Sequence, residues 1–130
     1  MLVVDASVVV RAVLADEGFS PFGLAELVAP ALLWSETTSA LRQLRYRDEI
    51  TPGEAADALE RLASAPVVLH DVRDLLVDAS QISELLGWAK TYDAEYVALA
   101  RFLGARLVTT DARLRRTASR LVETVGPTEV

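Results

Sequence analysis

The stretch Leu2-Val3-Val4-Asp5-Ala6-Ser7 is the one around which the rest of the chain is organised. Three apolar residues run without alternation into an aspartate. Such an unbroken run is typical of a strand buried on both faces, as in the middle of a parallel sheet. Ligands of open α/β sheets collect outside the carboxyl ends of the strands. Asp5 is therefore predicted to lie where chemistry takes place.

The chain has 130 residues, of which 52% are hydrophobic and 25% are charged. This length and composition predict one globular domain, residues 1–130, that can fold without metal or disulfide staples. The absence of cysteine excludes disulfides, zinc–thiolate sites and thiol catalysis. The N-terminal residues resemble no signal peptide and no apolar run is long enough to span a bilayer, so we expect a cytoplasmic protein.

The formal net charge of −6 argues against nucleic-acid binding through overall charge, because phosphate recognition normally relies on a basic surface. A nucleic-acid function would therefore depend on local arginines or on bound metal cations.

Helical and strand patterns alternate along the chain, which predicts an α/β fold with a mostly parallel central sheet flanked by helices on both sides. Helices are predicted at residues 7–14, 21–28, 33–47, 52–64, 71–88 and 93–103, and from Asp111 to about residue 120. After the first strand, further strands are predicted at residues 66–70, 106–110 and 121–125. Ser7 is predicted to cap the first helix, Thr51 and Glu54 to form a capping box, and Gly87 and Gly104 to end helices.

Four acidic residues occupy unusual places for surface charges. Asp5 and Asp111 each follow an apolar strand, Glu36 lies beside the apolar face of a helix, and Asp93 opens another helix. If the four converge at one end of the sheet, they must share protons or bind cations, and Mg²⁺ or Mn²⁺ prefers oxygen ligands of this type. Such ions activate water and stabilise a leaving oxygen, which predicts metal-dependent phosphodiester hydrolysis.

Simpler interpretations exist for three of these acids. Asp93 and Asp111 are each explained as helix N-caps, where aspartate is favoured, and the capping role is compatible with a ligand role. Glu36 taken alone is an ordinary solvated helix residue. Asp5 is the hardest to explain in this way, because a charge directly after a buried strand is costly unless something pairs with it.

Hydroxyl and basic residues accompany the acids. Ser7 follows Asp5 by two places, and Thr109 and Thr110 precede Asp111, so these side chains can orient a carboxylate or simply cap a helix and extend a strand. Two groups of arginines are candidate RNA-phosphate ligands or cations that complement helix C-termini; they include Arg42, Arg45, Arg113 and Arg116.

Several enzyme classes are excluded by what the sequence lacks. His70 is the only histidine, so neither a His-rich metal site nor a histidine triad can form within one chain. No serine or threonine has a recognisable base partner, and there is no glycine-rich phosphate loop of the P-loop or dinucleotide type.

The chain resembles a known family along essentially its whole length. The resemblance is carried by Val4-Asp5-Ala6-Ser7, by Trp34-Ser35-Glu36 with Leu41-Arg42, by the run from Tyr92 to Ala100, and by Leu107-Val108-Thr109-Thr110-Asp111. Together these segments resemble a PIN domain, and more narrowly the VapC toxins of toxin–antitoxin pairs. The run Tyr92-Asp93-Ala94-Glu95-Tyr96-Val97-Ala98-Leu99-Ala100 is the most specific part.

The resemblance implies a ribonuclease that uses Mg²⁺ or Mn²⁺ and whose acidic quartet is Asp5, Glu36, Asp93 and Asp111. It also implies a homodimer, a VapB-type antitoxin partner, and arrest of translation by cleavage of transfer or ribosomal RNA. Ser39 departs from the asparagine usual in the family, and Glu95 stands where small or apolar residues are usual. Neither departure removes an implied metal ligand.

Two other functions are weighed against the nuclease. A catalytically silent PIN-like module would act only by binding a partner, and the intact acidic quartet argues against it. A Mg²⁺-binding receiver-like signalling domain would need two neighbouring acids after the first strand and a lysine after the last strand. The chain has only Asp5 at the first place, and its sole lysine, Lys90, lies elsewhere.

Overall fold

The computed structural model describes all residues from 1 to 130. The strands are β1 (Leu2–Val4), β2 (Leu27–Pro30), β3 (Val67–His70), β4 (Arg106–Val108) and β5 (Thr124–Val125). The α-helices are α1 (Ala6–Leu14), α2 (Leu32–Tyr46), α3 (Pro52–Ala63), α4 (Leu76–Leu86), α5 (Tyr92–Leu103) and α6 (Ala112–Ala118). Two short 3₁₀ helices, η1 (Ser20–Phe22) and η2 (Arg73–Leu75), complete the elements.

All five strands pair in parallel in the order β3-β2-β1-β4-β5, so β1 is the central strand. Within β1, Val3 pairs with Val28 of β2 on one side and with Leu107 of β4 on the other. The residues Leu2, Val3 and Val4 are at most 4% exposed. The prediction of a central strand buried on both faces is confirmed.

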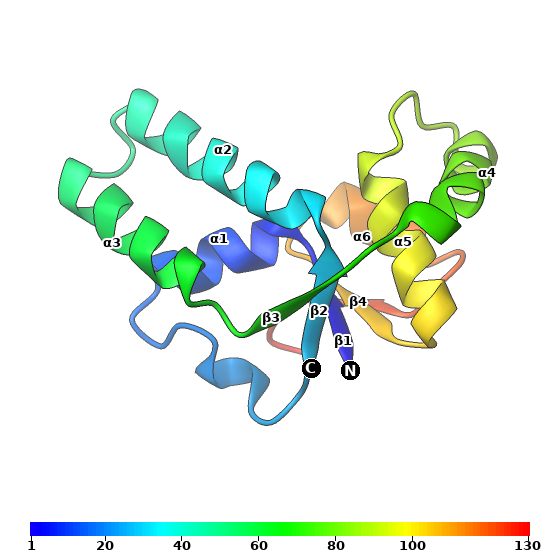
Figure 1. Ribbon diagram of the computed structural model, residues 1–130, viewed down its shortest axis with the longest axis horizontal. Helices are drawn as coiled ribbons and strands as arrows, with labels where there is room; N and C mark the ends of the chain where they lie inside the picture. The colour runs from blue at the N-terminus through cyan, green and yellow to red at the C-terminus, as the bar shows by residue number, and fades with distance from the viewer.

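The connections divide the helices into two groups. The chain moves from β1 through β2 to β3 by way of α1, α2 and α3, and then crosses back to β4 and β5 by way of α4, α5 and α6. Because parallel crossovers are right-handed, reversing the direction of travel places the second group of helices on the other face of the sheet. Figure 1 shows these two groups on opposite sides of the strands. The direction reverses between β1 and β4, which is the topological switch point where α/β sheets bind ligands.

Helix α5 is the most deeply buried helix and supports the centre of the sheet. It packs against β1, β2 and β4, and its residues from Tyr96 to Ala100 are all buried. These side chains belong to a single cluster of 29 buried apolar residues that also takes in all of β1. A helix buried in this way holds its first turn in a fixed place beside the carboxyl ends of the strands.

The helix predicted at residues 21–28 is wrong. The chain instead forms η1 and then the buried strand β2, which lies between β1 and β3. A short apolar run bounded by prolines does not distinguish a strand from a helix by its periodicity, and here burial on both faces decides the outcome. Ser7 is also not the cap of α1, because the N-cap is Asp5, whose side chain accepts from the Val8 amide.

Other boundaries differ less. The helix predicted at residues 71–88 begins later, since η2 precedes α4, and β4 and β5 are shorter than predicted. The capping box of Thr51 and Glu54 is confirmed, as are the helix ends at Gly87 (φ 74°) and Gly104 (φ 62°). Both glycines adopt the left-handed conformation that a residue with a Cβ avoids. No helix combines the length and the apolar character that crossing a membrane would require.

The packing predicts a clear difference between two leucines of α3. Leu62 is 7% exposed and belongs to the core, whereas Leu59 is 44% exposed. We expect Leu62→Ala to lower the free energy of unfolding by about 3 kcal/mol, because it leaves a cavity. The control Leu59→Ala should change it by less than about 1 kcal/mol. Urea unfolding of both variants tests this, and equal losses would contradict the packing described.

Candidate functional site

Asp5 lies at the junction of β1 and α1 and is 6% exposed. Its Oδ1 accepts hydrogen bonds from the Ser7 hydroxyl at 2.6 Å and from the Val8 amide at 3.2 Å. Its Oδ2 accepts from the Thr109 hydroxyl at 2.5 Å. A carboxylate has about four lone-pair positions, so these three bonds leave one of them free. The buried charge is thus held in a fixed orientation with remaining capacity for one ligand.

Thr109 joins the two strand ends on either side of the switch point. Its hydroxyl donates to Asp5 and accepts from the Asp111 amide at 3.0 Å. Ser7 makes a second link, since its hydroxyl accepts from the Thr110 amide at 3.0 Å. The hydroxyls predicted to orient a carboxylate, Ser7 and Thr109, therefore both contact Asp5 directly.

Asp111 caps α6, as the simpler interpretation predicted. Its Oδ1 accepts from the Arg113 amide at 2.9 Å and from the Leu114 amide at 3.2 Å. Its Oδ2 makes no hydrogen bond within the protein, and the residue is exposed. Capping therefore uses one carboxylate oxygen and leaves the other available, so the cap and the ligand interpretations remain compatible.

Glu36 lies in the second turn of α2 and is held by a residue that the sequence analysis did not single out for this role. The Tyr96 hydroxyl donates to Glu36 Oε1 at 2.6 Å, and Tyr96 is only 1% exposed. A buried tyrosine normally finds a partner for its hydroxyl, and Tyr96 follows Asp93 by three places, on the same face of α5. The tyrosine itself and its three-residue spacing from Asp93 can both be read from the sequence.

Asp93 is the second residue of α5 and does not cap it. The N-cap position belongs to Thr91, and no side chain provides a capping hydrogen bond there. The Asp93 carboxylate has no hydrogen-bond or ion-pair partner in the protein and remains in contact with solvent. The capping interpretation of Asp93 is therefore wrong, and both of its oxygens are free.

The charges of these acids act on one another. Burial raises the pKa of Asp5, and the Asp93 charge adds to this effect. Burial also raises the pKa of Glu36 despite the bond from Tyr96, with contributions from Asp93, Asp5 and Glu95. The pKa of Asp93 is raised by partial burial and by Asp111, and burial raises the pKa of Glu95.

No basic side chain compensates this group of acids. The four ion pairs of the protein are Arg45–Asp48, Arg47–Glu49, Arg73–Asp71 and Arg115–Glu129, and all lie elsewhere. Burial and the bond to Glu36 raise the pKa of Tyr96, so this residue remains a hydroxyl donor. The carboxyl edge of the sheet therefore carries a negative charge that the protein itself does not neutralise.

The chemistry of the four carboxylates suits a divalent cation better than the distances between them do. Free carboxylate oxygens remain on Glu36, Asp93 and Asp111, and Asp5 keeps one free lone-pair position; carboxylate oxygens are the ligands that Mg²⁺ and Mn²⁺ prefer. However, no three acidic or histidine side chains are close enough together to hold a metal ion as they stand. The predicted convergence is thus looser than a closed coordination shell, which is the arrangement expected of like charges that repel.

The other candidate residues fall into different places. Ser39 makes no hydrogen bond to Glu36, and its hydroxyl accepts from Gln43 Nε2 at 3.5 Å. Arg45 is paired with Asp48 at 2.6 Å, whereas Arg42 lies over the Tyr46 ring with its guanidinium carbon 5.7 Å from the ring centroid. Arg113 and Arg116 are exposed and form no ion pair.

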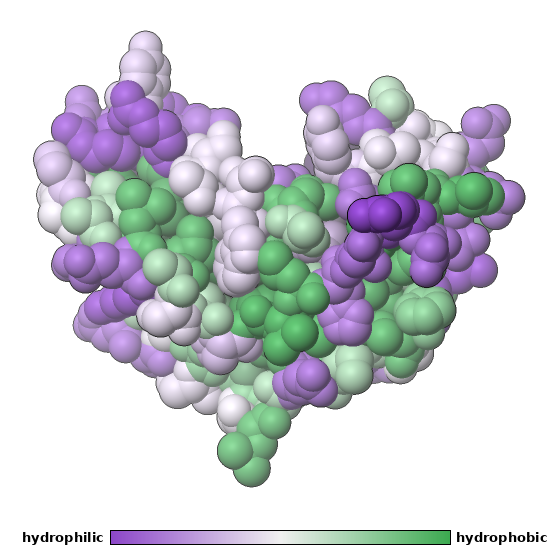
Figure 2. Space-filling view, in the orientation of Figure 1, coloured by the Kyte–Doolittle hydropathy of each residue, from purple (hydrophilic) through white to green (hydrophobic).

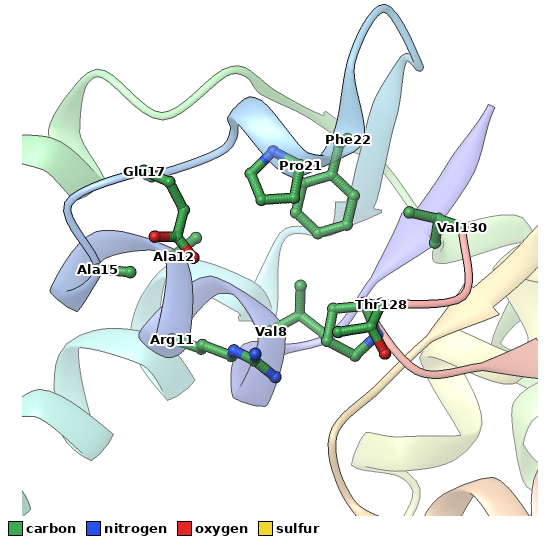
Figure 3. A pocket seen from close by; sticks show the side chains of 11 residues that line it. Val8, Arg11, Ala12, Ala15, Glu17, Pro21, Phe22, Thr128 and Val130 are labelled. Atoms are coloured by element: carbon green, nitrogen blue, oxygen red, sulfur yellow. The ribbon is translucent and has the colours of Figure 1, made fainter.

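The surface is hollowed in several places. Figure 2 shows the molecule indented between the part formed by α2 and α3 and the part formed by α4 and α5, on the side to which the strands' carboxyl ends point. A separate pocket of about 210 Å³ lies between α1, η1 and the C-terminal residues (Figure 3). None of the four acids lines that second pocket, so it is distinct from the acidic edge.

Comparison with known proteins places this arrangement in context. A match to the PIN domain family covers residues 2–120. The chain is 38% identical over 118 residues to VapC ribonuclease Mb0985 of Mycobacterium bovis, covering 90% of this chain and 91% of that protein. The values are the same for ribonuclease VapC9 of Mycobacterium tuberculosis.

Solved structures share the fold. PAE2754 from Pyrobaculum aerophilum superposes with a TM-score of 0.77 at 24% identity, covering 98% of this chain and 90% of the other. FitAcB from Neisseria gonorrhoeae superposes with a TM-score of 0.63 at 15% identity over the whole of both chains. With its parallel sheet, its acids at the switch point and its match along nearly the whole sequence, this chain belongs to the PIN domain family and is similar to the VapC ribonucleases within it.

Proposed function

We propose that this protein is a metal-dependent endoribonuclease, the toxin of a VapBC-type toxin–antitoxin pair. The observation that carries the proposal is the group of acids at the switch point, which have free oxygens and no basic partner. Two independent facts support it: the match to the PIN domain family and the 38% identity to proteins named VapC ribonucleases.

Asp5, Glu36, Asp93 and Asp111 are the proposed ligands of Mg²⁺ or Mn²⁺. When bound, such an ion activates water and stabilises the oxygen that leaves in phosphodiester hydrolysis. Asp5 is the fixed ligand, since Ser7 and Thr109 orient both of its oxygens. Asp93 and Asp111 are exposed, and their unbonded oxygens would complete the set of ligands around such an ion.

Tyr96 is proposed as a positioning residue for Glu36. Its buried hydroxyl holds Oε1 at 2.6 Å and leaves Oε2 free. Outer partners of this type fix the orientation of a metal ligand, and their loss typically weakens metal affinity or activity by about 10- to 100-fold.

The proposed partners follow from the relatives. A VapB-type antitoxin would neutralise the acidic edge with a basic side chain, and the 38% identity to proteins named VapC ribonucleases supports such a partner. Transfer or ribosomal RNA is the proposed substrate, and its cleavage would arrest translation. A homodimer is proposed as the functional form.

The nuclease proposal is tested directly with purified protein free of antitoxin. Incubated with total RNA and Mg²⁺ or Mn²⁺, it should cleave RNA, and Asp5→Asn should reduce the rate by at least about 100-fold because a ligand charge is lost. Gel analysis of the products and their end groups measures this. Cleavage that persists in Asp5→Asn or in excess chelator would contradict the mechanism, and the absence of cleavage by the wild type would favour a silent binding module.

The raised pKa values predict how stability depends on pH without metal. Asp5, Glu36, Asp93 and Glu95 bind protons more readily in the folded state than in the unfolded state. Their contribution to the free energy of unfolding therefore falls as pH rises from the ordinary carboxyl pKa through the raised values.

The matched variant is Asp5→Asn, which keeps the shape of the side chain and removes its buried charge. It should unfold at a higher urea concentration than the wild type at neutral pH and show a flatter pH dependence. Mg²⁺ or Mn²⁺ should stabilise the wild type more than the variant. If the variant is less stable than the wild type at neutral pH in chelator, the prediction is wrong.

Tyr96→Phe tests the positioning role. The ring stays in the core, but Glu36 loses its only hydrogen bond from the protein, so the concentration of Mn²⁺ needed for half-maximal cleavage should rise about tenfold or more. Phe102→Leu, at an exposed aromatic residue of the same helix away from Glu36, is the control and should be unchanged. If both variants respond to metal like the wild type, Tyr96 has only a packing role.

A further inference from the structure

A groove runs from the acidic edge along α2. Its volume is about 440 Å³, and it lies between α2 and the start of α5. Glu36 lines one end, so the groove is continuous with the proposed catalytic site, and the other lining residues are Leu32, Ser35, Ser39, Ala40, Gln43 and Tyr92. It is thus where a substrate segment next to the reacting phosphate would lie.

Tyr92 is the aromatic wall of this groove. It is 55% exposed, directly precedes Asp93 in the sequence, and its hydroxyl makes no hydrogen bond to the protein. The ring therefore exposes apolar surface to solvent, and its hydroxyl adds no hydrogen bond that would stabilise the fold. An exposed aromatic face beside a nuclease site is the type of surface on which unpaired bases stack.

Gln43 supplies a polar group on the α2 side. Its Nε2 donates to the Ser39 hydroxyl at an N–O distance of 3.5 Å, and the carbonyl oxygen and the second amide hydrogen have no partner in the protein. A carboxamide presents both a donor and an acceptor, which are the groups that recognise the edge of a base. The groove therefore combines a stacking face with a hydrogen-bonding group.

A basic and aromatic surface continues the groove beyond Gln43. A second hollow of about 350 Å³ is lined by Arg42, Gln43, Tyr46 and Arg47, and shares Gln43 with the first. Arg47 is paired with Glu49, whereas Arg42 has no acidic partner and lies over the exposed Tyr46 ring. Arg42 is thus the cation on this path that is free to contact a phosphate.

Resting on the proposed ribonuclease function, we propose that the α2–α5 groove binds an unpaired nucleotide of the RNA substrate adjacent to the cut site. The base stacks on Tyr92 and contacts Gln43, and the neighbouring phosphate lies against Arg42. A base stacked within a duplex cannot present its face to a tyrosine, so the nucleotide that enters this groove is an unpaired one. Stacking matters here because the net charge of −6 gives little general attraction for phosphate.

The experiment compares Tyr92→Ala, Tyr92→Phe and Phe102→Ala in the full chain. Phe102 is the matched control because it is an aromatic residue of the same helix, is 71% exposed and does not line the groove. Fluorescence anisotropy with single-stranded RNA of mixed sequence, in chelator, measures binding without cleavage. The same RNA annealed to its complement measures the preference for unpaired bases, and thermal unfolding checks that each variant is folded.

We expect Tyr92→Ala to weaken binding of the single strand and to raise KM for its cleavage about tenfold, with a smaller effect on kcat. Tyr92→Phe should restore both values, and Phe102→Ala should match the wild type. If Tyr92→Ala and Phe102→Ala behave alike, or if the wild type binds the duplex as well as the single strand, no unpaired base of the RNA occupies the groove.

These outcomes are distinct from failure of the proposed function. The nuclease proposal is contradicted if the wild type cleaves no RNA with Mg²⁺ or Mn²⁺. The groove proposal is contradicted if the wild type is active but its RNA binding and KM do not depend on Tyr92.

Discussion

The hydrogen bonds of the Asp5 carboxylate are the constraint on which the rest of the structure depends. A charge at the end of a fully buried central strand is tolerated only when its oxygens are satisfied. Three donors meet this requirement, and they come from the first turn of α1 and from the residue after β4. Satisfying one carboxylate therefore fixes the two strand ends relative to each other at the point where the sheet reverses its order.

The same edge also works against the stability of the fold. Burial and mutual repulsion raise the pKa of several acids there, and no arginine or lysine offsets them, although the chain has 13 basic residues. The arginines that do form ion pairs lie at the C-terminal end of α2, in η2 and in α6. Groups of perturbed, unpaired acids in a hollow are characteristic of functional sites, where the fold tolerates a local cost.

The features that the sequence predicts best are those that depend on local chemistry. The buried run before Asp5, the capping box at Thr51 and the glycine helix ends are all determined by a few neighbouring residues. Strand β2 was missed because its identity as a strand depends on β1 and β3, which are distant in the sequence. A short apolar segment takes its structure from its neighbours in space.

The functional site likewise has features that the sequence predicts and features that only the folded structure shows. The four acids are identified by their positions after strands and on helices, but their partners depend on the folded arrangement. The bond from Tyr96 to Glu36 joins residues 60 places apart, and that from Thr109 to Asp5 joins residues 104 places apart. An arginine is free unless an acidic residue nearby in the sequence pairs with it. Arg45 is paired in this way and Arg42 is not.

The four acids come from distant parts of the sequence, and this matters while the protein is being translated. They come from the turn after β1, from α2, from the start of α5 and from the turn after β4, and the Thr109 that orients Asp5 comes from the last fifth of the chain. While a ribosome is still translating, the growing chain has Asp5 and Glu36 but neither Tyr96 nor Thr109 to hold them. A nascent chain therefore has no assembled site until nearly all of the chain has emerged from the ribosome.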